Sequence, residues 1–121
     1  KAAKENTSVF FTGRVEDVRI EVGKCQIFVC PLTFGSGIKT KNLEAMAMGV
    51  PVVTTTIGAE NINAIDGRDW LIADDNQDFA DKIVQVLTDT SLREKLTVNG
   101  CSYVRSNFTW EIAKERMTQI I

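Results

Sequence analysis

Apolar and polar positions alternate along the chain in blocks that predict an α/β protein. Short, mostly apolar runs, which are typical of strands, occur at residues 8–12, 27–32, 52–56 and 70–73. Apolar residues that recur every three or four positions, as on one face of a helix, occur at residues 16–24, 39–48, 75–87 and 91–104. Strands that alternate with helices favour a Rossmann-like parallel sheet with flanking helices.

Several of the predicted helices have clear end signals. Gly49 follows helix 39–48, and glycine commonly ends a helix. Asp75 is expected to cap the next helix because its carboxylate can accept hydrogen bonds from first-turn N–H groups. Thr109 is expected to cap a last helix. The predicted core face of helix 75–87 consists of Ala80, Ile83, Val84 and Leu87. The core or a domain interface is the expected place of both tryptophans, Trp70 and Trp110.

Composition and charge exclude several classes of protein. The chain has 121 residues, which suits one domain over residues 1–121, and its net charge of -2 predicts no nucleic-acid partner. No apolar run is long enough to span a bilayer, and no signal-peptide pattern is visible at Lys1. The sequence contains no histidine, which excludes a Ser-His or Cys-His mechanism carried by this chain alone.

The three cysteines argue against a disulfide framework or a zinc site, because their number is odd and no CxxC pair occurs. Cys25 and Cys30 lie in or near an apolar run. We expect them to be small buried hydrophobic residues in a reducing cytoplasm. The chain begins with Lys1 in a polar stretch, so we expect a piece of a longer protein.

The most informative stretch joins strand 27–32 to helix 39–48 through the glycine-rich turn at residues 35–37. The first N–H groups of a helix have no intrahelical partner, and the helix dipole places partial positive charge there. Gly35 and Gly37 allow the backbone to approach an anion, and Lys39 adds a full positive charge. The stretch therefore predicts a phosphate-binding site.

Residues 35–53, GSGIKTKNLEAMAMGVPVV, resemble the donor-site segment of group 1 retaining glycosyltransferases, which have the GT-B fold. Residues 11–18, 71–75 and 108–111 also resemble landmarks of that family, so the resemblance covers nearly the whole chain. It implies the C-terminal, donor-binding domain of a GT-B protein, incomplete on its N-terminal side. A complete Rossmann-like domain has about six strands, so the first ones are expected upstream.

The resemblance assigns roles to individual residues. Glu44, in the second turn of helix 39–48, is expected to accept hydrogen bonds from the ribose hydroxyls, as suits a carboxylate at the carboxyl ends of parallel strands. The diphosphate is expected at Gly37, Ile38, Lys39 and Thr40, and the base pocket at Arg14 and Val15.

The chain also departs from the family. Many members carry a glutamate eight positions before the one that matches Glu44, and this glutamate is associated with the transferred sugar; here Ser36 occupies that position. Glu60, which follows strand 52–56, is either a contact to donor or acceptor or a residue with no part in binding.

The resemblance implies a protein that transfers a sugar from a nucleotide-diphospho-sugar to a glycan or lipid-linked acceptor, which the missing N-terminal domain would hold. It implies no metal or other cofactor, and it places the catalytic residues upstream. This chain alone is therefore expected to be inactive. Two alternatives stay open: a non-catalytic nucleotide-sugar-binding module and a GT-B-type epimerase.

Expectations about setting and assembly follow. Polysaccharide biosynthesis is the usual setting of such proteins, and the full-length parent is expected in the cytoplasm, either free or peripheral at the inner face of the membrane. A sheet that lacks its first strands has an unpaired edge. Such an edge invites pairing, so a homodimer through it is expected.

Overall fold

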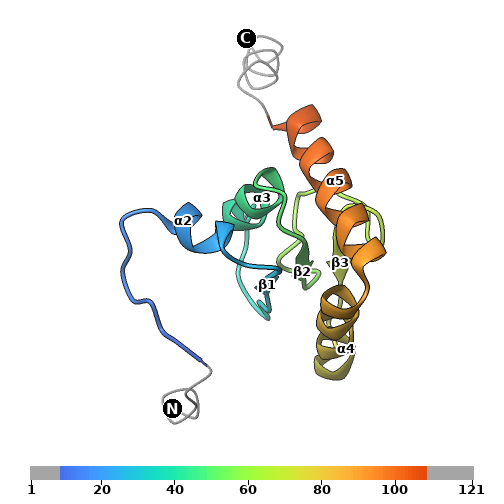
Figure 1. The fold of residues 1–121 in the computed structure, drawn as a ribbon, viewed down its shortest axis with the longest axis horizontal. Helices are drawn as coiled ribbons and strands as arrows, with labels where there is room; N and C mark the ends of the chain where they lie inside the picture. Colours follow the sequence, from blue (N-terminus) through green and yellow to red (C-terminus); the bar gives the residue numbers. More distant parts are fainter. Residues whose placement is uncertain (1–8, 109–121) are drawn as a thin grey trace.

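The computed structural model describes residues 9–108, which fold around a three-stranded parallel sheet in the order β1-β2-β3 (Figure 1). The strands are β1 (Phe28–Cys30), β2 (Val52–Thr54) and β3 (Leu71–Ile72). Phe28 pairs with Val52, and Val53 pairs with Leu71. The outer edge of β1 carries no partner strand within the described residues.

Helices flank the sheet, as predicted. They are α2 (Val18–Gly23), α3 (Thr40–Ala47), α4 (Asn76–Thr88) and α5 (Thr90–Asn107). An aspartate precedes each of α2, α4 and α5, and its side chain accepts hydrogen bonds from N–H groups of the first turn. These aspartates are Asp17, Asp75 and Asp89. Lys39 stands at the equivalent position of α3 and provides no such bond. The parallel sheet with flanking helices confirms the predicted fold class.

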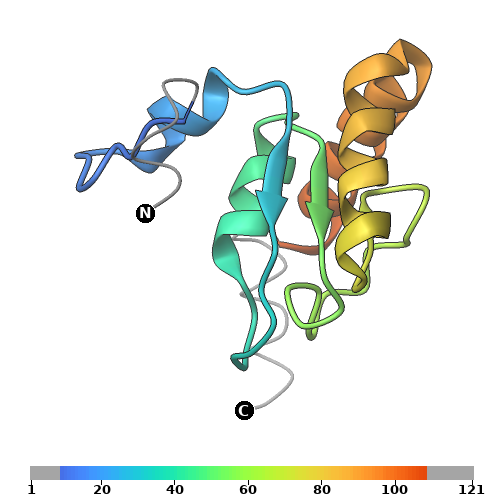
Figure 2. The same cartoon turned by 90° about the horizontal axis from the view of Figure 1, so that it is seen from below.

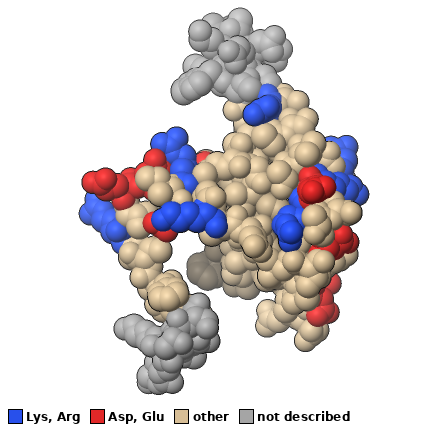
Figure 3. All heavy atoms as spheres, in the orientation of Figure 1, with Lys and Arg blue, Asp and Glu red and all other residues tan. Residues whose placement is uncertain are grey.

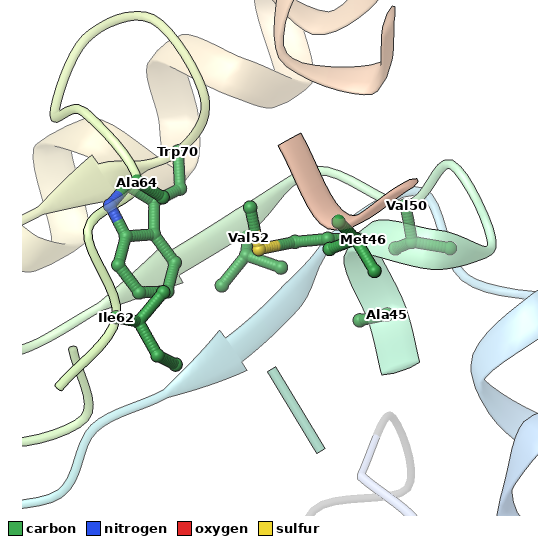
Figure 4. Close-up of a cluster of buried hydrophobic side chains, with 8 residues drawn as sticks. Ala45, Met46, Val50, Val52, Ile62, Ala64 and Trp70 are labelled. Atoms are coloured by element: carbon green, nitrogen blue, oxygen red, sulfur yellow. The ribbon is translucent and has the colours of Figure 1, made fainter. Parts of the chain in front are cut away.

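One face of the sheet is covered by α3 and by the second half of α5, which lie side by side (Figure 1). Val52 of β2 points to this face and lies between the Trp70 ring and the Met46 thioether (Figure 4). Trp70 and Val52 are fully buried, which confirms the expected core position of Trp70. Apolar burial of this kind is the main stabilising contribution to such a layer.

The other face of the sheet is covered by α4 and the first half of α5. Side chains alternate along a strand, so Val53, which follows Val52, points to this second face and packs against these helices. On α4, Val86 is fully buried, whereas Val84 is 57% exposed and Leu87 is 40% exposed. The predicted core face of this helix is therefore wrong for Ala80, Val84 and Leu87, which are exposed, and confirmed for Ile83, which packs against the core. The residues of α4 that pack against the sheet and α5 are Phe79, Ile83 and Val86, so the buried face is turned toward Phe79 and Val86 relative to the predicted one.

Residues 9–12 form no strand, which corrects the strand predicted at 8–12 and leaves three strands where four were expected. This segment extends away from the sheet (Figures 1 and 2), and Phe10 is 84% exposed. A strand forms by pairing, and no described segment lies beside this one. Cys25 is exposed, so the prediction that it is buried is also wrong. Thr109 and Trp110 lie outside the described residues.

A buried side-chain amide connects α3 to the turn that follows β2. The Nδ2 of Asn42, which is fully buried, donates to Gly58 O at 2.9 Å and to Thr54 Oγ1 at 3.3 Å. Thr54 Oγ1 donates in turn to Cys30 O at 3.3 Å. The amide thus fixes the first turn of α3 against β1, β2 and the turn at residues 56–61.

Gly58→Ala tests this connection. A Cβ at Gly58 would overlap the Thr54 hydroxyl, so the alanine has to push apart groups that Asn42 holds together. We expect the free energy of unfolding to fall by about 1–3 kcal/mol, measured by urea denaturation. Gly23→Ala is the matched control, because its Cβ would meet only the flexible end of Met48. Equal stability of the two variants would contradict the prediction.

Candidate functional site

The candidate site lies at the carboxyl ends of the parallel strands, where ligands bind in open α/β sheets. Residues 31–39 lead from β1 into α3, and the turn at residues 56–61 follows β2. The hydroxyl of Thr55 donates to Leu32 O at 2.6 Å, which ties the two segments together as they leave the sheet.

Within the glycine-rich turn, both glycines have backbone conformations that favour glycine. Gly35 has φ of 121° and Gly37 has φ of 84°. The ammonium of Lys39 donates to Gly37 O at 2.6 Å, and Gly37 N–H donates to Glu60 Oε1 at 2.6 Å. The turn therefore contacts a cation through Gly37 O and a carboxylate through Gly37 N–H, and the carboxylate comes from 23 residues away.

A groove of about 490 Å³ lies between β1 and the start of α3. Residues 28–32 line it along β1, and Ile38, Lys39 and Thr40 line it at the start of α3. Three of the four residues predicted for the diphosphate thus line one groove. Lys41, which is not among the residues predicted for the site, lines it too. No side chain caps α3, so its first N–H groups remain available to a ligand.

Glu44 lies exposed on α3, one turn after Thr40, and α2 packs against this helix. On α2, Arg19 pairs with Asp17 at 3.0 Å. The hydrogen bonds and charge of Asp17 raise the pKa of Arg19, and the charge of Glu44 adds a smaller contribution. The structure therefore brings Glu44 into the electrostatic range of Arg19.

Arg14 and Val15 belong to the segment before α2, and this segment lies apart from the sheet and α3 (Figure 1). Among the described residues, no hydrogen bond links them to residues 35–40. Figure 3 shows Lys, Arg, Asp and Glu side chains interspersed over α2 and the segment before it. The visible face therefore carries no large patch of one sign.

A second hollow, of about 370 Å³, opens between the carboxyl ends of the strands and is lined by threonines and by Asp74. The carboxylate of Asp74 accepts the Thr56 hydroxyl at 2.6 Å and the Thr56 N–H at 2.8 Å. These two hydrogen bonds, the hydroxyl first, lower the pKa of Asp74. They fasten the end of β3 to the turn that carries Glu60.

Two other kinds of feature are absent from residues 9–108. No three His, Cys, Asp or Glu side chains in this range gather closely enough to hold a metal ion. None of the helices in the same range is both long enough and apolar enough to cross a bilayer.

Comparison with protein families identifies the class. The profile of the family described as glycosyl transferases group 1 matches residues 1–89. The chain therefore belongs to the glycosyl transferases group 1.

Curated relatives agree with this assignment. The capsular polysaccharide biosynthesis glycosyltransferase CapM of Staphylococcus aureus is 30% identical over 93% of this chain and 30% of its own length. A GDP-mannose-dependent monoacylated alpha-(1-6)-phosphatidylinositol monomannoside mannosyltransferase of Corynebacterium glutamicum is 28% identical over 99% of this chain and 34% of its own length. The chain thus spans about a third of the length of these relatives.

Two solved structures are similar to the fold. Sucrose-phosphate synthase from Thermosynechococcus elongatus superimposes with a TM-score of 0.80 and 26% identity, over 93% of this chain and 29% of that one. The C-terminal domain of a glycosyl transferase group 1 family protein from Francisella tularensis gives a TM-score of 0.73 and 25% identity, over 84% of this chain and 53% of that one. The C-terminal GT-B arrangement implied by the resemblance is confirmed.

Sequence reasoning missed two features of the site. The role of Asn42 was not predicted, although it falls on the buried stripe of α3 with Ala45 and Met46. A polar residue at an apolar position of a helix is the available signal. The contact between Glu60 and Gly37 was also missed, because nothing in the spacing of the two residues indicates it.

Asp74→Asn gives a test based on pH. The folded-state pKa of Asp74 is lowered, so its stabilising contribution is present above the unfolded-chain value of about 3.9 and is lost as the pH falls through the folded-state value. We expect wild type to be more stable than the variant at neutral pH, and the difference to shrink below about pH 4. Urea denaturation between about pH 7 and pH 3 measures it.

Thr56→Val is the matched control, because it removes the hydroxyl that contributes most to the pKa shift while leaving the carboxylate in place. Thr56→Val should also be less stable than wild type at neutral pH, and this difference should shrink at low pH in the same way but be smaller than that of Asp74→Asn. A difference between wild type and Asp74→Asn that stays constant over this pH range would contradict the assignment.

Proposed function

We propose that this chain is the donor-binding part of a retaining glycosyltransferase, which transfers a sugar from a nucleotide-diphospho-sugar. The observation that carries the proposal is the glycine turn that leads into the uncapped start of α3 at the carboxyl ends of the strands, in a member of the glycosyl transferases group 1. Every other helix with described bounds has an aspartate at its start.

The proposed diphosphate site consists of the turn and the first residues of α3: Gly37, Ile38, Lys39 and Thr40. The helix start offers N–H donors and partial positive charge, and Lys39 offers a full charge. During transfer, negative charge grows on the leaving diphosphate. Fixed donors and a fixed cation stabilise that charge without having to reorganise.

The ribose is proposed to bind at Glu44. Its exposed carboxylate lies one turn further along α3, so a nucleotide whose diphosphate is at the helix start can extend its ribose along this helix. The base is proposed to lie toward the segment before α2, at Arg14 and Val15. The packing of α2 against α3 supports this direction, because Arg19 of α2 lies within range of the charge of Glu44 and the segment with Arg14 and Val15 leads directly into α2.

The remaining parts of the activity concern the full-length protein. The acceptor is proposed to be a glycan or lipid-linked sugar, held by an N-terminal domain that also supplies catalytic residues, with no metal ion. The proposed location is the cytoplasm, free or at the inner face of the membrane. Homodimerisation through the outer edge of β1 is a further proposal. CapM of Staphylococcus aureus carries capsular polysaccharide biosynthesis in its name, which supports a role in polysaccharide assembly.

Calorimetric titration with UDP, GDP and ADP tests the donor site. We expect one nucleotide to bind, and Glu44→Ala to weaken that binding about tenfold or more, because hydrogen bonds to charged groups contribute about 1.5–3 kcal/mol. Glu94→Ala is the control, since Glu94 is exposed on α5 beside Gly49 and Pro51, at the opposite end of the sheet. If the folded wild-type protein binds none of the three nucleotides, the proposed function is wrong.

Lys39→Ala tests the diphosphate site separately from the ribose site. The variant loses the ammonium at the glycine turn, so we expect affinity for the nucleoside diphosphate to fall about tenfold while affinity for the monophosphate changes less. The same titration with UMP, GMP and AMP measures the difference. Lys95→Ala, an exposed position on α5, is the matched control. An equal loss for mono- and diphosphate would contradict the assignment of Lys39.

A further inference from the structure

The carboxylate of Glu60 lies against the glycine turn, inside the region proposed for the donor. Its Oε1 accepts Gly37 N–H at 2.6 Å, a short, charge-assisted hydrogen bond. Glu60 itself is half-buried. The backbone on which it sits is anchored two residues earlier, because Gly58 O accepts the buried Asn42 amide and Gly58 N–H donates to the Thr55 hydroxyl at 3.1 Å. The carboxylate is thus held in place by the fold.

This contact divides the donor site into two parts of opposite charge. A phosphate beside the Glu60 carboxylate would meet a like charge, and the Gly37 N–H that it would need is already donated. At Gly37 O, by contrast, the Lys39 ammonium and the uncapped start of α3 that follows it favour an anion. The diphosphate therefore belongs with Lys39, and the group beside Glu60 has to be neutral and rich in donors.

A sugar ring meets this requirement. In a nucleotide-diphospho-sugar the sugar is joined directly to the terminal phosphate, so it lies next to the diphosphate. A carboxylate has about four acceptor sites on two oxygens. Among residues 9–108, one hydrogen bond, from Gly37 N–H to Oε1, occupies one of these acceptor sites on Glu60. The turn beside it presents Gly35 and Gly37, which have no side chains, so a ring can approach the backbone closely.

We propose that Glu60 is a sugar-binding residue, whose carboxylate accepts hydrogen bonds from hydroxyls of the transferred sugar. The inference rests on the proposed function, since it requires a nucleotide-diphospho-sugar at this turn. It adds a residue to the donor site and assigns it to the sugar, apart from the groups that bind the diphosphate and ribose. It also moves Gly37 from the diphosphate to the sugar end of the site.

Comparing bare nucleotides with their sugar conjugates tests this assignment. The probes are UDP against UDP-glucose and GDP against GDP-mannose, titrated into the full-length protein and its Glu60→Ala and Glu60→Gln variants. In Glu60→Ala we expect affinity for the sugar nucleotide to fall about tenfold or more, and affinity for the bare diphosphate to stay the same or rise slightly. Glu60→Gln keeps an oxygen acceptor without the charge, so its loss should be smaller.

Other outcomes overturn the inference in distinguishable ways. An equal loss of both ligands in Glu60→Ala, restored in Glu60→Gln, would mean that Glu60 only holds the turn. Tighter binding of both ligands would mean that its carboxylate competes with the diphosphate for Gly37 N–H. Unchanged binding of both would remove Glu60 from the site. Glu94→Gln is the control for a charge lost far from the turn.

The failure of the proposed function gives a different result. In that case the folded wild-type protein binds neither the bare nucleotides nor the conjugates, and the inference fails with it. Thermal unfolding of each variant, followed by circular dichroism, establishes that the compared proteins are folded.

Discussion

The buried amide of Asn42 is the interaction on which the geometry of the site depends. Among residues 9–108, it is the one point where α3, the end of β2 and the turn that carries Glu60 are held by a single side chain. Because the amide is fully buried, water cannot replace these hydrogen bonds, and breaking them leaves polar groups unpaired. Gly58 is required for the same arrangement, because a side chain at this position would overlap the Thr54 hydroxyl that Asn42 contacts.

This anchoring explains how a short, exposed glycine turn can have a defined shape. Glycines lose much conformational freedom when they are ordered, so the turn needs contacts from outside itself. It receives one from Lys39 and one from Glu60, which lies two residues after the anchored Gly58. The charges of the two side chains are opposite, and they contact different backbone atoms of Gly37: Lys39 its carbonyl oxygen and Glu60 its N–H. The same contacts that fix the turn therefore also give its two sides different chemical character.

The helix starts show a related division between structure and function. Asp17, Asp75 and Asp89 satisfy the first N–H groups of α2, α4 and α5, which stabilises those helices internally. At the start of α3 a lysine replaces the aspartate, so this helix forgoes that stabilisation. Its stability comes from burial of Ala45 and Met46 and from Asn42. A ligand with negative charge can then occupy the place that a capping carboxylate takes elsewhere.

The sequence by itself determined the class of fold and the order of β1, α3, β2, β3, α4 and α5, because these follow from local periodicity. It also determined the aspartate cap of α4 and the glycine turn, because these depend on residues with distinct backbone preferences. The tertiary structure alone decided which stripe of α4 packs, whether residues 9–12 find a strand partner, and that Glu60 meets Gly37. Each depends on which segments lie side by side, and on α4 two adjacent stripes are both apolar, so local pattern cannot choose between them. Only packing against β2 and α5 selects the buried one.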